Sequence, residues 1–495
     1  MKQIENKIML ITYGNTLGAD LKELEQNLKK YIPRGAVCGL HLLPFYPSSG
    51  DRGFAVINYD TVDPALGTWE DIDRLGSQYY LMADFMLNHV SIRCDEFRDY
   101  MERGDASPYR DMFIHWDEFW PGGEPSEEER KMLYCRKPVL PKMDFVRKDG
   151  KKVSLWNTFF QEQIDINPYA PATGDYYARN LKRIASHVPL VRFDAFAYTS
   201  KRPGTSCFFV EPEIWEILDL SMKPLEETGT RMLAEIHENY HIQLKMAEHG
   251  YWVYDFALPM LLLHAIKSGQ SQRLIHWLKI CPRNQFTTLD THDGIGVVDV
   301  VDLLSDEEID LVRDDVDDIT RDARPYLRFP SMIKTDKGKS RLYQMGCTFY
   351  SALRCNDNDY LLARAVQFFT PGIPQVYYVG MLAGENDVEA LMRGEEPRSI
   401  NRHTYSEREL EEAVAKPVVK QLFRLMQFRN SYPAFDGDFA VTPGPEVSPG
   451  KTSRLTITWT HNSYRCTLSC DMETKSFDIT YFDPDTREMT RLLLS

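Results

Sequence analysis

The segment PLVRFDAFAY, residues 189–198, combines a short apolar run with a polar residue, Asp194, near its end. Branched and aromatic residues in a run of this length are typical of a strand that is buried on both faces. The same arrangement of an apolar run followed by polar residues recurs in LNH (87–89), AEIHE (234–238) and LDTHDG (289–294). Strands of this kind, separated by longer amphipathic stretches, predict an α/β fold with a parallel sheet.

Eight such runs occur in the first 380 residues, which predicts a closed (β/α)8 TIM barrel. We place them at Ile8 to Gly14, Val37 to Tyr46, Tyr80 to His89, Pro189 to Tyr198, Met232 to His237, Val253 to Leu261, Phe286 to Asp293 and Ile373 to Gly380. In this fold the active site forms at the C-terminal ends of the strands. The polar residues that follow the runs are therefore expected to meet at one mouth of the barrel.

The spacing of the runs predicts the division of the chain. Residues 91–187 are too many for one crossover helix, so we expect an inserted subdomain over the barrel mouth after the third strand. Residues 303–345 form a second excursion, expected to be a long active-site loop region. The catalytic barrel is assigned to 1–90 and 188–430. In residues 431–495 polar and apolar residues alternate, which predicts a small C-terminal antiparallel β domain.

The composition is that of a folded globular protein. Of the 495 residues, 43% are hydrophobic and 26% charged, which excludes disordered and collagen-like classes. The formal net charge of −15 argues against nucleic acid and anionic membranes as partners, so an anion would need a local basic cluster. The nine cysteines are scattered without a CxxC pair, and the charged N-terminus is unlike a signal peptide or an anchor. We therefore expect a cytoplasmic protein.

Three acidic residues follow predicted strands: Asp194, Glu235 and Asp293. A carboxylate at the end of a buried strand is costly unless it is paired or functional, and Arg192 and His292 offer pairing nearby. Structural ion pairing is therefore one interpretation. The other is glycoside chemistry, because two carboxylates about 5–5.5 Å apart cleave glycosidic bonds with retention. Asp194 and Glu235 are separated by one βα unit, so they are expected on neighbouring strands, which favours the retaining geometry.

Four segments resemble the characteristic regions of the α-amylase superfamily, glycoside hydrolase family 13, in their usual order. They are DFMLNH (84–89), VRFDAFAY (191–198), LAEIHE (233–238) and LDTHDG (289–294). Within this superfamily the chain is most similar to the sucrose phosphorylases. That similarity is carried by GDRGFAVINYDTVDPALGTWEDI (50–72), GTSCFFVEPEIW (204–215), VYDFALPMLLLHAI (253–266), TTLDTHDGIGVVDV (287–300), QFFTPGIPQVYYVGMLAGENDVEAL (367–391) and INRHTYS (400–406). The resemblance implies an enzyme without a cofactor that converts sucrose and phosphate to α-D-glucose 1-phosphate and D-fructose through a covalent β-glucosyl-enzyme.

The same resemblance implies roles for individual residues. Asp194 would be the nucleophile, Glu235 the general acid/base and Asp293 the transition-state stabiliser. The glucose site would be formed by Asp51, Phe54, His89, Gln163, Arg192, His237, His292 and Arg402. Phe54 would stack on the sugar, and Asp51 and Arg402 can form a bidentate pair that closes the far end of a one-glucose pocket. A closed end excludes polymeric substrates.

Basic residues in the two excursions are candidates for binding phosphate and the acceptor. Arg136 and Lys137 lie in LYCRKPVLP (133–141), and Arg341, Tyr343 and Gln344 lie in SRLYQM (340–345). In the second of these segments sucrose phosphorylases usually have Asp-Leu-Tyr-Gln, and this chain has Arg341 in place of that Asp. A cation in place of an acceptor favours a phosphorylated or acidic leaving group. Sucrose 6'-phosphate, glucosylglycerol and glucosylglycerate are therefore alternative substrates for the same chemistry.

Three interpretations compete with this one. HENYH (237–241) satisfies the HExxH pattern of zinc proteases, although it directly follows an apolar run and that motif needs the middle of a helix. The acidic run 306–318 suggests calcium but lacks the glycine and terminal glutamate of an EF-hand loop, so we expect no metal. A barrel that has lost its activity and serves as a scaffold is the third, and the presence of all three acids argues against it. The pattern makes no prediction of the oligomeric state.

Overall fold

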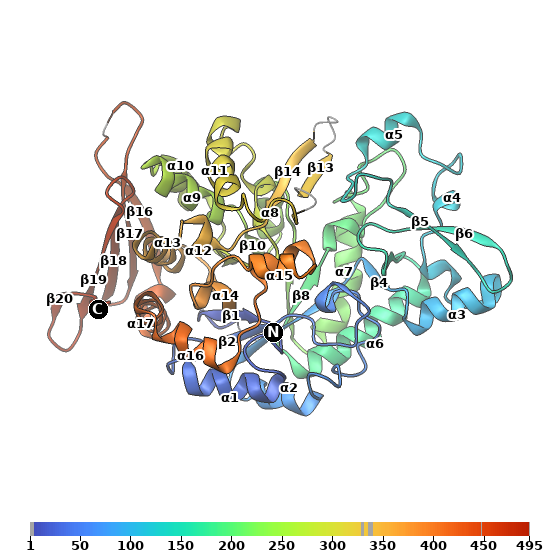
Figure 1. Cartoon of the computed structure of the whole chain (residues 1–495), viewed down its shortest axis with the longest axis horizontal. Coiled ribbons are helices and arrows are strands. Elements are labelled where there is room, and N and C mark those ends of the chain that lie inside the picture. The colour runs from blue at the N-terminus through green and yellow to red at the C-terminus, as the bar shows by residue number, and fades with distance from the viewer. Residues whose placement is uncertain (1–3, 328–330, 335–339, 447, 495) are drawn as a thin grey trace.

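The centre of the molecule is a closed barrel of eight parallel strands (Figure 1). The computed structural model describes residues 4–327, 331–334, 340–446 and 448–494, and of 331–334, 340 and 341 the backbone alone. The strand order around the barrel is β1-β15-β11-β10-β9-β8-β3-β2. The strands are β1 (Met9–Thr12), β2 (Gly39–Leu42), β3 (Tyr80–Met86), β8 (Leu190–Asp194), β9 (Arg231–Ala234), β10 (Trp252–Asp255), β11 (Gln285–Thr287) and β15 (Ile373–Tyr377). Each overlaps one predicted run, so the predicted TIM barrel is confirmed.

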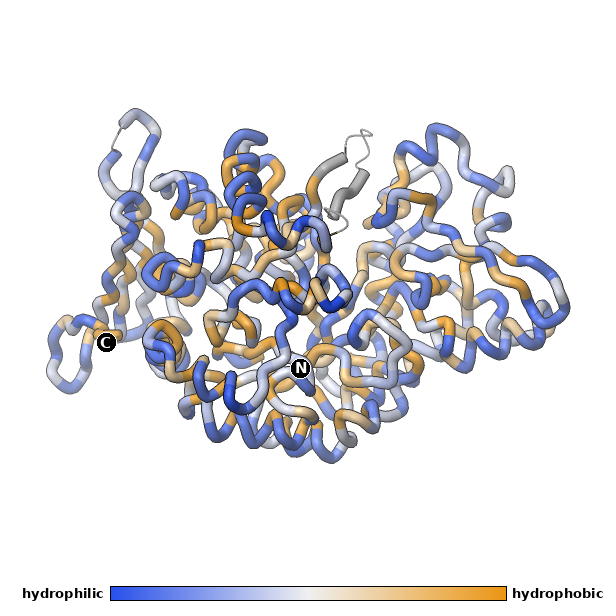
Figure 2. The backbone as a smooth tube through the Cα atoms, viewed as in Figure 1, coloured by the Kyte–Doolittle hydropathy of each residue, from blue (hydrophilic) through white to orange (hydrophobic). Residues whose placement is uncertain are grey.

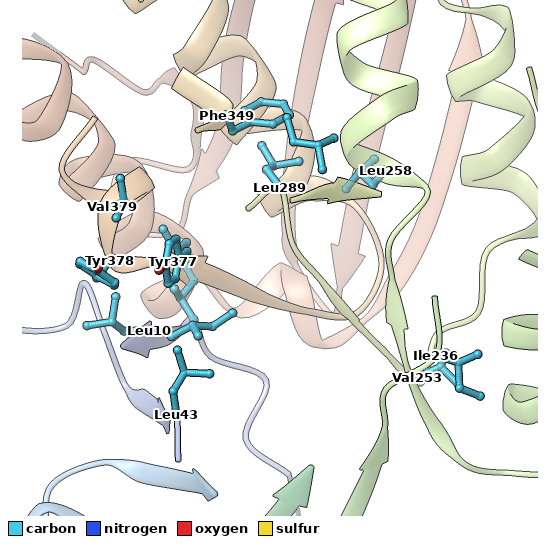
Figure 3. Close-up of a cluster of buried hydrophobic side chains, with 14 of the residues drawn as sticks. Leu10, Leu43, Ile236, Val253, Leu258, Leu289, Phe349, Tyr377, Tyr378 and Val379 are labelled. Atoms are coloured by element: carbon cyan, nitrogen blue, oxygen red, sulfur yellow. The ribbon is translucent and has the colours of Figure 1, made fainter. Parts of the chain in front are cut away.

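Both faces of the barrel strands are buried. Seven strands contribute one residue each to an apolar cluster, which we assign to the barrel interior: Met9, Met82, Leu190, Leu233, Tyr254, Phe286 and Ile373. The next residues along four of these strands, Leu10, Ala83, Val191 and Ala234, belong to the larger hydrophobic core. In Figure 3, Leu10 of β1, Leu43 after β2 and Tyr377 of β15 gather in this core. Burial of both faces explains why these strands appear as continuous apolar runs.

Amphipathic helices surround the barrel, and Figure 2 shows apolar and polar residues mixed along them. Helix α1 illustrates the local code: the Asp20 side chain caps its N-terminus by accepting from Glu23 N, and Leu21, Leu24 and Leu28 form its buried face. The other principal helices are α2 (Trp69–Gly76), α6 (Pro171–His187), α7 (Glu213–Glu226), α8 (Tyr240–Glu248), α9 (Leu258–Ser268), α10 (Gln272–Ile280), α13 (Asp357–Phe369), α16 (Glu407–Ala415) and α17 (Pro417–Ser431), and α1 spans Leu21–Tyr31. Among the described residues, none of these helices has the length and apolar character needed to cross a bilayer.

The segment between β3 and β8 extends to one side of the barrel in Figure 1. It contains two small antiparallel sheets, in which β4 pairs with β7 and β5 pairs with β6. An aromatic cluster around Trp116, Trp120 and Trp156 forms a core of its own. Its elements are β4 (His89–Ser91), α3 (Asp95–Arg103), α4 (Trp116–Phe119), α5 (Glu127–Met132), β5 (Lys142–Val146), β6 (Lys152–Trp156) and β7 (Gln163–Asp165). The bounds 91–187 for this subdomain stay a prediction.

The segment after β11, which contains the second excursion, carries a small antiparallel sheet in the order β12-β14-β13. Its elements are β12 (Ile295–Gly296), α11 (Asp306–Ile319), β13 (Ser331–Lys334) and β14 (Ser340–Met345). The acidic run 306–318 forms nearly the whole of helix α11, and Ser305 and Glu308 form a capping box at the N-terminus of this helix. Short helices α12 (Phe349–Ala352), α14 (Tyr378–Met381) and α15 (Val388–Met392) line the rest of the mouth side.

The C-terminal residues form a five-stranded antiparallel sheet, as the alternating pattern predicts. Its strands are β16 (Asp438–Pro443), β17 (Arg454–His461), β18 (Tyr464–Asp471), β19 (Ser476–Asp483) and β20 (Glu488–Arg491). The sheet packs against α13, and the indole of Trp459 donates to the carbonyl of Phe369 at 2.8 Å. It therefore supports the barrel at a helix and lies away from the strand ends that carry the acids.

Candidate active site

Asp194 and Glu235 end two neighbouring strands of the barrel. Asp194 is the last residue of β8, and Glu235 directly follows β9, which pairs with β8. Ala195 has a left-handed backbone (φ 52°), which turns the chain sharply after Asp194. Its N–H donates to Glu235 Oε2 at 3.1 Å. The backbone next to one acid thus holds the carboxylate of the other, and both acids line the same cavity.

Arg192 is a buried cation beneath the two acids. One of its terminal nitrogens lies 2.9 Å from Asp194 Oδ1 and also bonds Asp84, and the other lies 3.9 Å from Glu235 Oε1. Asp84 in turn bonds His41 Nε2 at 2.8 Å. Burial raises the pKa of Asp194 well above its ordinary value, and the charge of Arg192 opposes that rise. The guanidinium therefore favours the ionised form of Asp194 that a nucleophile requires.

Asp293 contacts an arginine that the sequence did not single out. Arg398 lies 3.1 Å from Asp293 Oδ1 and 3.7 Å from Asp51 Oδ1, so it spans two acids of the site. Burial acts to raise the pKa of Asp293, but charges led by those of the Arg398 and Arg402 guanidiniums outweigh it and hold the pKa far below its ordinary range. Asp293 is thus a permanent anion, the state required to stabilise positive charge on a sugar ring.

The predicted bidentate pair between Asp51 and Arg402 is wrong for this structure. Within the described residues no ion pair joins them; Arg402 Nε donates instead to the carbonyl of His292 at 2.8 Å. Asp51 accepts from Gln163 Nε2 at 3.3 Å and faces Arg398. Arg398 lies closer to Asp51 because it belongs to the turn η6 (Pro397–Asn401) and lines the cavity. Arg402 follows this turn and is not among the residues that line the cavity.

Asp51 sits in a strained turn. Asp51, Arg52 and Gly53 have successive φ values of 51°, 45° and 111°, a conformation that residues with a side chain rarely adopt. A Cβ on Gly53 would lie 2.6 Å from the carbonyl oxygen of Pro44, so only glycine fits there. Arg52 braces the turn from behind by donating to the carbonyl of Arg402 at 2.9 Å. The turn therefore holds the Asp51 carboxylate in one fixed place.

Two rings form a wall beside this turn. Phe54 stacks on His292 with centroids 4.7 Å apart and planes at 10°. His89 Nε2 lies 3.2 Å from the carbonyl of Phe54, so His89, also predicted in the glucose site, lies beside the same wall. Burial lowers the pKa of His292 well below its ordinary value, so its imidazole is neutral at physiological pH. Neutral, flat rings suit the apolar face of a pyranose.

Most predicted site residues line one cavity at the mouth of the barrel. The predicted residues on its wall are Asp51, Phe54, His89, Arg136, Gln163, Asp194, Glu235, His292, Asp293, Tyr343 and Gln344. Sequence reasoning missed Phe159, Phe160, Tyr198 and Arg398, which also line it. Only Tyr198 gave a signal, as the end of the run 189–198. Of the predicted residues whose side chains are described, four lie outside this lining set: Lys137, Arg192, His237 and Arg402.

The two basic residues predicted in the insertion, Arg136 and Lys137, contact different partners. Arg136 places its guanidinium 3.6 Å from the ring centre of Tyr343, and within the described residues its buried Nη1 has no hydrogen-bond partner. Lys137 instead donates to the side chain of Asn157. Arg341 lies in β14 opposite Ile333, and its side chain is outside the described part of the structure. Arg136 is therefore the described cation best placed to receive an anion.

The HENYH segment does not form a protease-type zinc motif. His237 lies in the loop after β9, whereas His241 lies in the first turn of α8. The two histidines therefore do not share one helical face, which the HExxH motif requires.

Comparison with known proteins gives several matches. The alpha-amylase catalytic domain family matches residues 11–177. A sucrose phosphorylase of Streptococcus mutans is 48% identical over 88% of this chain and 89% of its own. A glucosylglycerol phosphorylase of Marinobacter adhaerens is 41% identical over 99% of both chains. A sucrose 6(F)-phosphate phosphorylase of Thermoanaerobacterium thermosaccharolyticum is 40% identical over 99% of this chain and 100% of its own.

Solved structures extend these matches. A crystal structure of a sucrose 6F-phosphate phosphorylase superposes with a TM-score of 0.92 at 39% identity, covering 99% of each chain. An alpha-amylase of H. orenii, at 15% identity and a TM-score of 0.65, shares the fold alone.

Proposed function

Because this chain belongs to the sucrose phosphorylase family, with a catalytic domain of the alpha-amylase type, we propose that it transfers glucose from sucrose to inorganic phosphate. The products are α-D-glucose 1-phosphate and D-fructose, and the anomeric configuration is retained. One observation carries the proposal: Asp194 and Glu235 end neighbouring strands, line one cavity and are held together by the Ala195 N–H.

In the first step Asp194 attacks the anomeric carbon while Glu235 gives its proton to the glycosidic oxygen. The bond to fructose breaks, and a covalent β-glucosyl ester forms on Asp194. The charge of Arg192 favours the ionised form of Asp194 against the effect of burial, and the charge of Asp293 stabilises the positive charge on the ring. Phosphate then gives a proton to Glu235 and attacks the anomeric carbon, and the ester bond from this carbon to Asp194 breaks, which releases α-glucose 1-phosphate and restores both acids.

The glucose pocket in this proposal is closed by the strained turn at Asp51 and the wall of Phe54 and His292. Arg398 belongs to the same pocket, because it contacts both Asp51 and Asp293. Phosphate and the leaving group enter from the side of Arg136, Tyr343 and Gln344. The insertion and the second excursion, with the bounds 91–187 and 303–345, supply this side.

Replacing Arg136 with alanine is expected to raise the KM for phosphate by about 10- to 100-fold, because a charge-assisted contact to a dianion is lost. The KM for sucrose should change little. Initial rates of glucose 1-phosphate formation at varied phosphate measure this. The control is Arg130→Ala, an exposed arginine of the same insertion. Equal phosphate KM values in Arg136→Ala and the parent enzyme would remove Arg136 from the phosphate site.

A second candidate function keeps the chemistry and changes the leaving group. Relatives that act on sucrose 6-phosphate and glucosylglycerol match this chain over 99% of its length, whereas the sucrose phosphorylase at 48% identity matches over 88%. Arg341 also stands where sucrose phosphorylases usually have an acid. A phosphorylated or acidic leaving group is therefore the alternative to fructose.

One assay decides between these substrates. Purified enzyme is incubated with phosphate and, in separate reactions, sucrose, sucrose 6'-phosphate, glucosylglycerol and glucosylglycerate, and glucose 1-phosphate is measured. We expect the highest kcat/KM with sucrose. If sucrose is ignored and its phosphate ester consumed, the alternative holds and Arg341→Asp becomes the variant to test. Release of free glucose in place of glucose 1-phosphate would contradict both.

We place the enzyme in the cytoplasm. All nine cysteines lie in the described ranges, and none of them forms a disulfide there. This number of cysteines without a disulfide is typical of a reducing compartment.

A further inference from the structure

His237 is fixed directly behind Glu235. The residue is 5% exposed and lies outside the cavity lining. Its ring stacks on Phe256 with centroids 3.7 Å apart and planes at 16°, and it meets Tyr343 edge-on at 5.7 Å. Its Nε2 lies 3.8 Å from Glu235 Oε1. The ring is therefore held so that one nitrogen faces the proposed acid/base and not the substrate.

The other nitrogen of His237 faces a buried carboxylate. Asp299, in the turn η5 (Val298–Val300), is 0% exposed, and its Oδ2 lies 3.2 Å from His237 Nδ1. Its Oδ1 accepts from Gln243 Nε2 at 3.4 Å. A Cβ on Gly296 would lie 2.3 Å from Asp299 Oδ2, so the glycine leaves the room in which this pair forms. Side chains from four segments of the chain thus converge on one imidazole.

The surroundings of His237 favour its charged form. The ionisable groups that face it are the carboxylates of Asp299, Glu235 and Asp293 and the phenol of Tyr343. Burial acts to lower the pKa of His237, but the charge of Asp299 and its hydrogen bond outweigh it and raise the pKa above its ordinary value. Nδ1–H then points to Asp299, and Nε2–H points to Glu235.

We propose that Asp299 is a positioning residue for proton transfer: through His237 it places a positive charge beside the carboxylate that Glu235 becomes when it donates its proton. This inference rests on the proposed function. In the step concerned, the Glu235 O–H proton passes to the glycosidic oxygen, the bond from carbon to that oxygen breaks, and Asp194 forms the new bond to the carbon. The imidazolium keeps its own proton throughout and stabilises the new carboxylate.

The test is Asp299→Asn, which keeps the shape of the side chain and removes its charge. In the Asp299→Asn variant His237 should lose its proton at a lower pH than in the parent, because a neighbouring anion no longer favours the imidazolium. We expect kcat on the best glucoside donor to fall about 10- to 100-fold, with a smaller loss on α-glucosyl fluoride, whose leaving group needs no proton. The alkaline limb of the kcat profile, where His237 loses its proton, should move to lower pH.

Asp302→Asn is the matched control, since Asp302 closely follows Asp299 in the chain and contacts Asn239 on the surface. It should leave the profile unchanged. A His237→Gln variant and the double variant with Asp299→Asn extend the test. If Asp299 acts through His237, the second change adds little to the first. Losses that multiply, or an Asp299→Asn profile equal to that of the parent, would overturn the inference.

Nitrogen-15 NMR of labelled histidines reads the same contact without turnover. His237→Gln identifies the His237 signals among the twelve histidines of the chain. We expect an imidazolium that titrates at higher pH in the parent than in Asp299→Asn. Equal titration in the two proteins would overturn the inference even if the enzyme is a phosphorylase. If the parent phosphorolyses none of the four glucosides, the proposed function is overturned instead. The NMR comparison would still show whether Asp299 raises the pKa of His237.

Discussion

Asp194→Ala is expected to lower kcat for glucose 1-phosphate formation by about 10⁴-fold or more, because without the carboxylate no covalent glucosyl-enzyme forms. The loss should fall on kcat and not on the sucrose KM, since the pocket wall at Asp51 and Phe54 is unchanged. Coupled detection of glucose 1-phosphate at saturating sucrose and phosphate measures it. Near-normal turnover would remove Asp194 from the mechanism.

A small external nucleophile provides the control for this variant. Alanine leaves space on the face that Asp194 attacks, and azide in that space should give β-glucosyl azide, the inverted product. Thermal unfolding of the variant shows whether the fold is retained, because Arg192 also loses its contact to Asp194. A folded variant that yields α-glucosyl azide would contradict attack from the Asp194 side.

Glu235→Gln is expected to lower kcat on sucrose by about 10²- to 10⁴-fold, because the amide has no proton to give to the fructose oxygen. Glutamine keeps an oxygen that can accept from the Ala195 N–H, so the side chain should stay in place. With α-glucosyl fluoride the loss should be much smaller, since fluoride departs without protonation. Parallel kinetics on the two donors measure the difference.

The two donors also serve as each other's control. An equal loss on sucrose and on the fluoride would assign Glu235 a structural role and leave the acid unidentified. Accumulation of a glucosyl-enzyme from the fluoride, seen by mass spectrometry of the intact protein, would place the covalent ester before the step that uses phosphate.

The barrel and the three acids could be predicted because their signals are local. A buried strand that ends in an acid, as at Asp194, has a sequence pattern of its own, and the strand order of the barrel then brings Glu235 next to it. The direction of a loop side chain has no such signal. Arg136 and Lys137 are neighbours of the same charge, yet one lines the cavity and the other bonds Asn157.

The same limit applies at the glucose end of the site. Arg398 and Arg402 lie in one short segment, and nothing in the sequence says which of them faces Asp51. The substrate contact expected for His237 stays a prediction, and the structure places this residue outside the cavity lining, where Phe256 and Asp299 hold it next to Glu235. Both outcomes depend on contacts from segments distant in the chain, which no local pattern contains.

The backbone at residues 51–53 has a consequence for redesign of the donor specificity. Two left-handed residues with side chains cost about 1–3 kcal/mol each, and the hydrogen bond from Arg52 to the carbonyl of Arg402 braces the turn. Trimming the Asp51 side chain alone would leave this main-chain turn in place. A variant that takes a two-sugar maltosyl unit into this pocket in place of a glucosyl unit would need a different loop between β2 and α2.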